Sequence, residues 1–282
     1  MTDLDPRFGG VARLLGPEAL ARLGRAHVCI VGLGGVGSWA VEALARSGVG
    51  RMTLVDFDVV SVSNINRQIH ALEPTVGQPK AQVLADRVRL IHPHIEIEIV
   101  PARFSEETAA RILETPYDCL LDAIDGAANK SRLIAGCCAR HIPVVTSGGA
   151  GGRRNPARVR IDDLAFSSHD RLLAQVRAIL RQDHAFPRGQ SPFGVPCVHS
   201  TEPAVSAQTP EPAAAPQAGA GRASDDCDPA NPVFGTAVFV TGTFGFALAS
   251  LAVKRIAGSS PHVSWSCDRG GADNSKMRSA AR

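Results

Sequence analysis

The fold is decided by residues 27–56, which read His-Val-Cys-Ile-Val-Gly-Leu-Gly-Gly-Val-Gly-Ser-Trp-Ala-Val-Glu-Ala-Leu-Ala-Arg-Ser-Gly-Val-Gly-Arg-Met-Thr-Leu-Val-Asp. An apolar run leads into four closely spaced glycines, after which apolar residues recur at helical spacing. A second apolar run ends in Asp56, close to the acidic position about 20 residues beyond the glycines of the dinucleotide fingerprint. This order predicts a strand, a tight turn and a helix that together bind a nucleotide.

The glycines Gly32, Gly34, Gly35 and Gly37 have distinct expected uses. Gly32 can take the turn without a Cβ clash, Gly34 lets the backbone approach a phosphate, and Gly37 lets the helix pack close to the strand. The helix start offers unpaired N–H groups to an anion. Asp56 is then expected to receive the ribose hydroxyls.

The next segment distinguishes among nucleotides. After Asp58 come Asn66-Arg67-Gln68 and then Lys80. An enzyme that holds a triphosphate, and stabilises charge as pyrophosphate leaves, needs such cations, whereas an NAD-dependent oxidoreductase does not. We therefore expect ATP, with surface solubility as the alternative role for Arg67 and Lys80.

Two carboxylates follow a further apolar run, Asp122 and Asp125. Ligands bind at the carboxyl ends of parallel strands, and a hard oxygen ligand there suits Mg²⁺ bound to phosphates. We assign that role to Asp125. The alternative, that one of them caps a helix starting near Asn129, is at least as strong for Asp122.

These motifs, in this order and spacing, resemble those of the E1-like adenylating enzymes, which include ubiquitin-activating enzymes and the bacterial activators of sulfur carriers. The similarity also takes in Arg7-Phe-Gly-Gly-Val-Ala-Arg13, Val145-Thr-Ser-Gly-Gly-Ala-Gly-Gly152 and Val240-Thr-Gly-Thr-Phe-Gly-Phe246, and is strongest to the tRNA-modifying dehydratase branch. The resemblance implies a doubly wound, mainly parallel α/β sheet of Rossmann type. The strand and helix alternation through residue 146 points the same way.

The resemblance also implies a reaction. ATP, with Mg²⁺, would adenylate the carboxylate of N6-threonylcarbamoyladenosine at tRNA position 37, and ring closure would expel AMP. Two alternatives remain open: adenylation of a small sulfur-carrier protein, and nicotinamide-dependent oxidoreduction. A non-catalytic membrane scaffold is a further hypothesis.

Seven cysteines stand without a Cys-x-x-Cys pair, so we expect no structural zinc. The sulfur-carrier activators usually have such pairs, which favours the dehydratase branch. A thioester would use Cys227 first and Cys197 second, although intramolecular cyclisation needs no enzyme nucleophile. Cys29 and Cys119 fall inside apolar runs and are expected to be structural.

Residues 1–26 are expected to form an N-terminal helical arm, with Leu14, Leu15, Leu20 and Leu23 as its apolar side. In the resembled family such an arm crosses to the second subunit of a homodimer and delivers an arginine to its active site. Arg13 is the candidate and Arg7 the reserve, with plain surface charge as the alternative.

The remaining boundaries follow from composition. Residues 27–266 are expected to form one ATP-binding α/β domain, with a flexible loop at 187–232 that is rich in Ala and Pro, and 267–282 a polar tail. Residues 233–253 carry no charge, which predicts either a buried helix, the favoured reading, or a membrane segment.

A net charge of +3 is too small to decide for or against nucleic acid. Arginines do concentrate just past the glycine-rich strand end, at Arg153, Arg154, Arg158, Arg160, Arg171, Arg177, Arg181 and Arg188. They could bind tRNA phosphates or form a solvated face. Without a leader or a disulfide framework, a cytoplasmic location is expected, with a sulfur-relay protein as a further partner.

Overall fold

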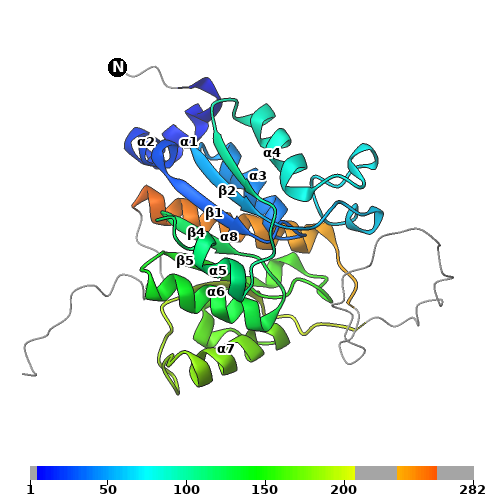
Figure 1. Ribbon diagram of the computed structural model, residues 1–282, viewed down its shortest axis with the longest axis vertical. Helices are drawn as coiled ribbons and strands as arrows, with labels where there is room; N and C mark the ends of the chain where they lie inside the picture. The colour runs from blue at the N-terminus through cyan, green and yellow to red at the C-terminus, as the bar shows by residue number, and fades with distance from the viewer. Residues whose placement is uncertain (1–4, 207–233, 259–282) are drawn as a thin grey trace, which may run out of the picture.

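The computed structural model describes residues 5–206 and 234–258, and its centre is a seven-stranded sheet (Figure 1). In spatial order the strands are β3 (Glu96–Val100), β2 (Arg51–Val55), β1 (His27–Val31), β4 (Cys119–Asp122), β5 (Val144–Ser147), β7 (Pro196–Ser200) and β6 (Val159–Asp163). Neighbouring strands are parallel except β6, which runs antiparallel to β7. The doubly wound, mainly parallel α/β fold expected from the sequence is confirmed.

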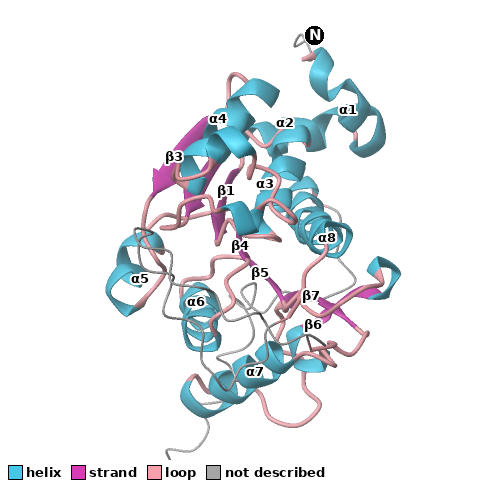
Figure 2. Cartoon of the chain, turned by 90° about the vertical axis from the view of Figure 1, so that its right-hand side faces the viewer, coloured by secondary structure: helices cyan, strands magenta, loops and turns pink. Residues whose placement is uncertain are grey.

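Helices cover both faces of the sheet (Figure 2). One face is covered by α2 (Pro17–Arg25), α3 (Gly37–Arg46), α4 (Lys80–Ile91) and α8 (Val238–Ala257), and the other by α5 (Glu106–Ile112), α6 (Ala127–Ala139) and α7 (Arg171–Asp183). Strand residues alternate between the two cores: Val28 and Ile30 pack with the first set, Cys29 and Val31 with the second. A sheet buried on both faces explains the continuous apolar runs of β1 and β4.

Short 3₁₀ helices occupy the connections, at Pro6–Phe8, Val62–Asn64, Glu73–Thr75, Pro156–Arg158 and Leu164–Phe166. Because these strands run parallel, the carboxyl ends of β1, β2, β4, β5 and β7 meet at one edge. We call this the carboxyl edge.

The prediction of a flexible loop over residues 187–232 is partly wrong, because this range contains the strand β7. All five β7 residues are buried, between β5 on one side and β6 on the other. The strand starts with a proline and follows a Gly- and Pro-rich stretch, so its five residues offered no periodicity to detect. Residues 207–233 and the expected tail at 267–282 lie outside the described residues.

The N-terminal arm is helical as expected, with α1 (Gly9–Leu15) and α2. Leu20 and Leu23 are buried, but Leu14 is 82% exposed, so the expected apolar side is wrong there. The Phe8 ring packs edge-on against the His92 ring, just past the end of α4. The arm therefore lies at the amino edge of the sheet, opposite the carboxyl edge.

Helix α8 is long and apolar enough to cross a membrane by length and composition, and half of its apolar window is buried inside the protein. It packs against α3, α2 and strands β4, β5 and β7. Gly245 allows this closeness, because a Cβ there would lie 2.6 Å from the carbonyl oxygen of Val36. The packing agrees with the core helix favoured from the sequence, while Phe239 and Phe246 remain exposed.

Candidate active site

The glycine turn after β1 is built for close approach. Gly32 has φ +89°, and a Cβ on it would lie 2.8 Å from the carbonyl oxygen of Ala123 in the loop after β4. A Cβ on Gly37 would lie 1.8 Å from the carbonyl oxygen of Gly32. Gly34 has open space instead: the nearest atom to its Cβ position is the Gln68 Nε2, at 4.0 Å. The turn thus leaves a backbone cradle at the start of α3, which suits a phosphate.

Asp56 lies at the carboxyl end of β2, beside this turn. Its Oδ2 accepts a hydrogen bond from the Leu33 amide at 2.6 Å, and its Oδ1 accepts from the Asp58 amide at 2.8 Å. Burial raises the pKa of Asp56, and the charge of Lys80 opposes that rise. The carboxylate is held in place by two backbone amide donors. Its remaining lone pairs can accept hydrogen bonds from the two hydroxyl groups of a ribose.

Lys80 begins α4 and points into the site. Its Nζ lies 2.8 Å from the Asp58 Oδ2, and its side chain is 8% exposed, against 39% for Asp58. Its backbone amide donates to the Asp58 carbonyl, which fixes the start of the helix. The ammonium group is therefore held beside the glycine turn rather than in bulk solvent.

Arg67 and Asn66 belong to a segment that is tied to α8. The Arg67 Nη1 donates to the Ser63 carbonyl and to the Asn66 Oδ1, at 2.6 and 3.0 Å. The Asn66 Nδ2 donates to the Thr236 carbonyl at 3.0 Å, and the Trp39 Nε1 donates to the Arg67 carbonyl at 3.0 Å. Sequence reasoning missed Trp39 and Thr236 because both act across large sequence separations.

Buried polar atoms without a partner lie on the same segment and on the neighbouring first turn of α3. Among the described residues no hydrogen bond reaches the Gln68 Oε1, either ring nitrogen of His70, or the Ser38 Oγ. Burial, followed by the charges of Lys80 and Arg87, lowers the pKa of His70 to about 4. An unpaired buried acceptor is costly, so the orphaned Gln68 oxygen beside the open space at Gly34 is consistent with a polar ligand here.

The loop after β4 separates the two candidate aspartates. Asp122 is fully buried, with its Oδ1 2.9 Å from the Lys130 Nζ and its Oδ2 accepting from the Thr146 Oγ1. Neither aspartate caps α6, which starts at Ala127 after Gly126 with no side-chain cap, so the capping alternative is wrong. Asp125 is exposed at the carboxyl edge, where it could bind a cation.

The sequence contains a signal that could have identified Lys130 as the partner of Asp122. Lys130 is in helical phase with Leu133, Ile134 and Cys137, which are all buried on one face of α6. A lysine on an apolar helix face needs a buried counter-charge, and the sheet supplies one.

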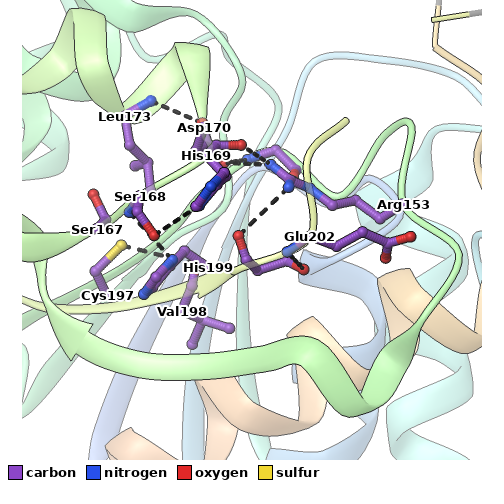
Figure 3. Close-up of polar contacts among 12 residues, drawn as sticks. Arg153, Ser167, Ser168, His169, Asp170, Leu173, Cys197, Val198, His199 and Glu202 are labelled. Atoms are coloured by element: carbon purple, nitrogen blue, oxygen red, sulfur yellow. Dashed lines mark hydrogen bonds and ion pairs between the residues drawn. The ribbon is translucent and has the colours of Figure 1, made fainter. Parts of the chain in front are cut away.

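A buried ion pair links the loop after β5 to the start of α7 (Figure 3). The Arg153 Nη2 lies 3.5 Å from the Asp170 Oδ2 and donates to the His169 carbonyl at 2.8 Å. Asp170 also accepts from the Gly149 amide at 2.9 Å. Arg153 thus stabilises the backbone, and its guanidinium is not available to an external phosphate.

The remaining candidates lie elsewhere or outside the described residues. Arg13 is exposed on the arm at the amino edge, and Arg7 pairs with Asp5 at 2.9 Å, so neither reaches this chain's own glycine turn. Cys197 is fully buried in β7, and burial raises its pKa, which makes it a poor nucleophile. Cys29 and Cys119 are buried in strands, as expected, and Cys227 is not among the described residues.

A cavity of about 480 Å³ opens at the amino edge, lined by Arg22, Tyr117, Asp118 and Arg255 among others. It lies at the opposite end of the strands from Gly32 and Lys80, so it is separate from the site. The residues described here include no group of three or more potential metal ligands.

Comparisons with known proteins agree with this geometry. The chain is 42% identical over 253 residues to the tRNA threonylcarbamoyladenosine dehydratase of Haemophilus influenzae, covering 89% of this chain and 94% of that protein. It is 44% identical over 252 residues to the Escherichia coli enzyme of the same name, covering 89% and 93%. The match to the E. coli molybdopterin-synthase adenylyltransferase is 46% identical but covers only 46% of this chain and 51% of that one.

Solved structures extend the similarity to three dimensions. The E. coli tRNA N6-threonylcarbamoyladenosine dehydratase in complex with ATP superposes with a TM-score of 0.78 at 42% identity, covering 89% of this chain and 94% of that one, and a complex with AMP gives the same values. The ThiF family matches residues 10–267, which include the glycine turn, Asp56, Lys80 and Asp125. On sequence, fold and site, the chain belongs to the ThiF family.

Proposed function

We propose that this protein is an ATP-dependent dehydratase that acts on N6-threonylcarbamoyladenosine in tRNA. The observation that carries the proposal is similarity over 89% of the chain to two enzymes of that name, together with a buried Lys80 beside a glycine turn. The nicotinamide and sulfur-carrier alternatives have less support, because the sulfur-carrier relatives match only about half of the chain.

The proposed reaction has two steps. The substrate carboxylate attacks the α-phosphorus of ATP, which forms an acyl-adenylate and releases pyrophosphate. A nucleophile within the substrate then attacks the activated carbonyl carbon, loses its proton and expels AMP. The substrate loses one water overall, and ATP is converted to AMP and pyrophosphate.

The site residues have matching proposed roles. Gly32, Gly34, Gly35 and Gly37 cradle the phosphates, and Asp56 holds the ribose. Arg67 and Lys80 stabilise the triphosphate charge as pyrophosphate leaves, with Asp58, Asn66 and Gln68 orienting them. Asp125 would hold Mg²⁺, whose chemistry is to neutralise the phosphate oxygens.

A homodimer would complete the site. Because Arg13 lies at the amino edge, it could act only in the active site of a second copy, where a cation would stabilise the developing phosphate charge. Cys227 is retained as a candidate for a thioester, with a sulfur-relay protein as a partner. We propose a cytoplasmic location, with membrane association through α8 as the less favoured alternative.

The test uses the purified full-length protein with ATP, Mg²⁺ and bulk tRNA that carries the modification. Nucleoside digestion followed by mass spectrometry should show that the modified adenosine has lost the mass of one water, with AMP formed in equal amount. Pyrophosphate exchange stimulated by a small protein ending in Gly-Gly, with no change in the tRNA, would instead support the sulfur-carrier reading. Binding of NADH without ATP would support the oxidoreductase reading.

A further inference from the structure

Seven of the eight arginines between 153 and 188 divide into two groups, and the eighth, Arg188, is exposed in the loop between α7 and β7 and belongs to neither. Arg153, Arg177 and Arg181 are engaged: Arg153 pairs with Asp170, Arg177 bonds the Ser167 hydroxyl, and Arg181 lies over the Phe193 ring at 5.0 Å. By contrast Arg154, Arg158, Arg160 and Arg171 are exposed. Within the described residues, the side chains of Arg154, Arg158 and Arg171 make no hydrogen bond or ion pair, and Arg160 bonds only the nearby carbonyls of Ala157 and Val159.

The exposed group lies at the carboxyl edge, the same edge as the glycine turn. Val159 is paired with Ser200, the last residue of β7, so β6 and the 3₁₀ turn before it begin where β7 ends. Arg171 is the first residue of α7, and its neighbour Asp170 is bonded to the Gly149 amide just past β5. These four arginines therefore surround the exits of β5 and β7, while Lys80 and Arg67 flank the turn after β1.

The backbone that presents them is held firmly. The Glu202 carboxylate accepts hydrogen bonds from the Arg154 and Asn155 amides, at 3.0 and 2.8 Å. The Gly152 amide donates to the Gly235 carbonyl, and the Gly152 carbonyl accepts from the Val205 amide. The loop is thus anchored on both sides and offers its side chains at low entropic cost.

Acidic groups around the four arginines are mostly occupied. Asp170 is paired with Arg153. Asp162 lies 2.8 Å from the His199 Nε2. Glu202 is the nearest opposing charge, and its pKa is lowered first by hydrogen bonds from the Asn155 and Arg154 amides and then by the charges of Arg153 and Arg158. The surface is therefore net positive without an internal counter-ion for each guanidinium.

We propose that Arg154, Arg158, Arg160 and Arg171, which we call the arginine surface, bind backbone phosphates of the tRNA and bring its modified adenosine to the adenylation site. This inference rests on the proposed function. Guanidinium groups match phosphate oxygens in a two-bond geometry, and releasing counter-ions from a polyanion makes such binding salt-dependent. Four exposed guanidiniums around one strand edge suit a nucleic-acid backbone better than a single small anion.

The test substitutes three of these arginines in the full-length protein, R154Q, R158Q and R171Q, which removes charge without removing a hydrogen bond within the described residues. The KM for tRNA should rise roughly tenfold or more at physiological salt, while kcat at saturating tRNA and the KM for ATP stay within about twofold. The slope of log affinity for tRNA against log salt should fall by about one per arginine.

The matched control carries the same charge change at the amino edge, R25Q, R111Q and R140Q, at the ends of α2, α5 and α6. Its tRNA affinity and salt slope should equal those of the unsubstituted protein. Equal effects in both triple variants, or an unchanged slope in the first, would overturn the inference. Salt-dependent tRNA binding that depends on the arginine surface, with no water lost from the tRNA, would instead overturn the proposed reaction and leave the surface standing.

Discussion

Two lysine–aspartate pairs stand at the carboxyl edge of the sheet, one just after β2 and one at the end of β4, and they differ in burial. The Lys80–Asp58 pair is 2.8 Å long and its aspartate is 39% exposed. The Lys130–Asp122 pair is 2.9 Å long and both side chains are fully buried. The same two residue types, at nearly the same distance, thus occupy different dielectric environments.

The difference indicates which pair can change partners. The Lys130 Nζ donates hydrogen bonds both to the Asp122 Oδ1 and to the Ile124 carbonyl, and both oxygens are held in place by the fold. Lys80 faces a solvent-accessible carboxylate beside an open glycine turn, so a phosphate could replace Asp58 with little loss. We therefore interpret Lys130–Asp122 as structural and Lys80–Asp58 as a resting contact of a binding residue.

Breaking the buried pair should have the largest effect. In Lys130→Met the Asp122 carboxylate loses its only charged partner among the described residues and stays buried, which costs about 3–5 kcal/mol of folding free energy. That is a large share of the roughly 5–15 kcal/mol typical of a domain. Urea unfolding monitored by circular dichroism measures it. A loss under about 1 kcal/mol would contradict the structural role.

Breaking the half-exposed pair should affect catalysis instead. Lys80→Met should reduce kcat/KM for ATP by about 10²–10³-fold, because removing one preorganised charge from a reacting phosphate typically costs that much. The urea midpoint should stay close to that of the unsubstituted protein. Full activity, or loss of activity only through unfolding, would place Lys80 with Lys130 as a structural residue.

His70 offers a pH test of the region beside Lys80. Its folded pKa of about 4 lies below the ordinary value of 6.5, so between these values the unfolded chain binds a proton that the folded chain does not. Its contribution to stability is complete above about pH 6.5 and is lost as the pH falls toward about 4, by roughly 3 kcal/mol at most. His27 and His92 also have lowered pKa values, so the comparison must be made with a variant.

The variant is His70→Leu, which cannot titrate and leaves no ring nitrogen unpaired. Urea unfolding of both proteins at several pH values between 7.5 and 5 gives the difference in stability. That difference should change with pH in favour of the variant on acidification. Parallel pH dependences would show that His70 has a solvated, ordinary environment.

The smallest effect is expected for Asp58→Asn. Its contact with Lys80 is partly exposed, and such pairs are typically worth about 0–1 kcal/mol. The thermal midpoint should therefore move only slightly, whereas Asp122→Asn, the matched change in the buried pair, should lower it clearly. Equal shifts in the two variants would remove the distinction between the pairs.

Much of the structure around the glycine turn and β2 could be predicted, because its sequence signals are local. Gly32 and Gly37 are required by turn geometry, and Asp56 follows directly from the end of an apolar run. The half around β5, β7 and β6 could not be predicted in the same way. Arg153 appeared to be one of eight surface arginines, and only the fold brings Asp170 beside it. The strand β7 is too short and too buried to show a period.

Lys80 and Arg67 are proposed to bind the β- and γ-phosphates of ATP. Calorimetric titration of the Lys80→Met, Arg67→Met double variant with ATP and with AMP tests this most directly. The Kd for ATP should rise by roughly a hundredfold, about 1.4 kcal/mol for each lost charge, while the Kd for AMP should change by less than about threefold. Equal weakening of both nucleotides, or unchanged ATP affinity, would contradict that proposal.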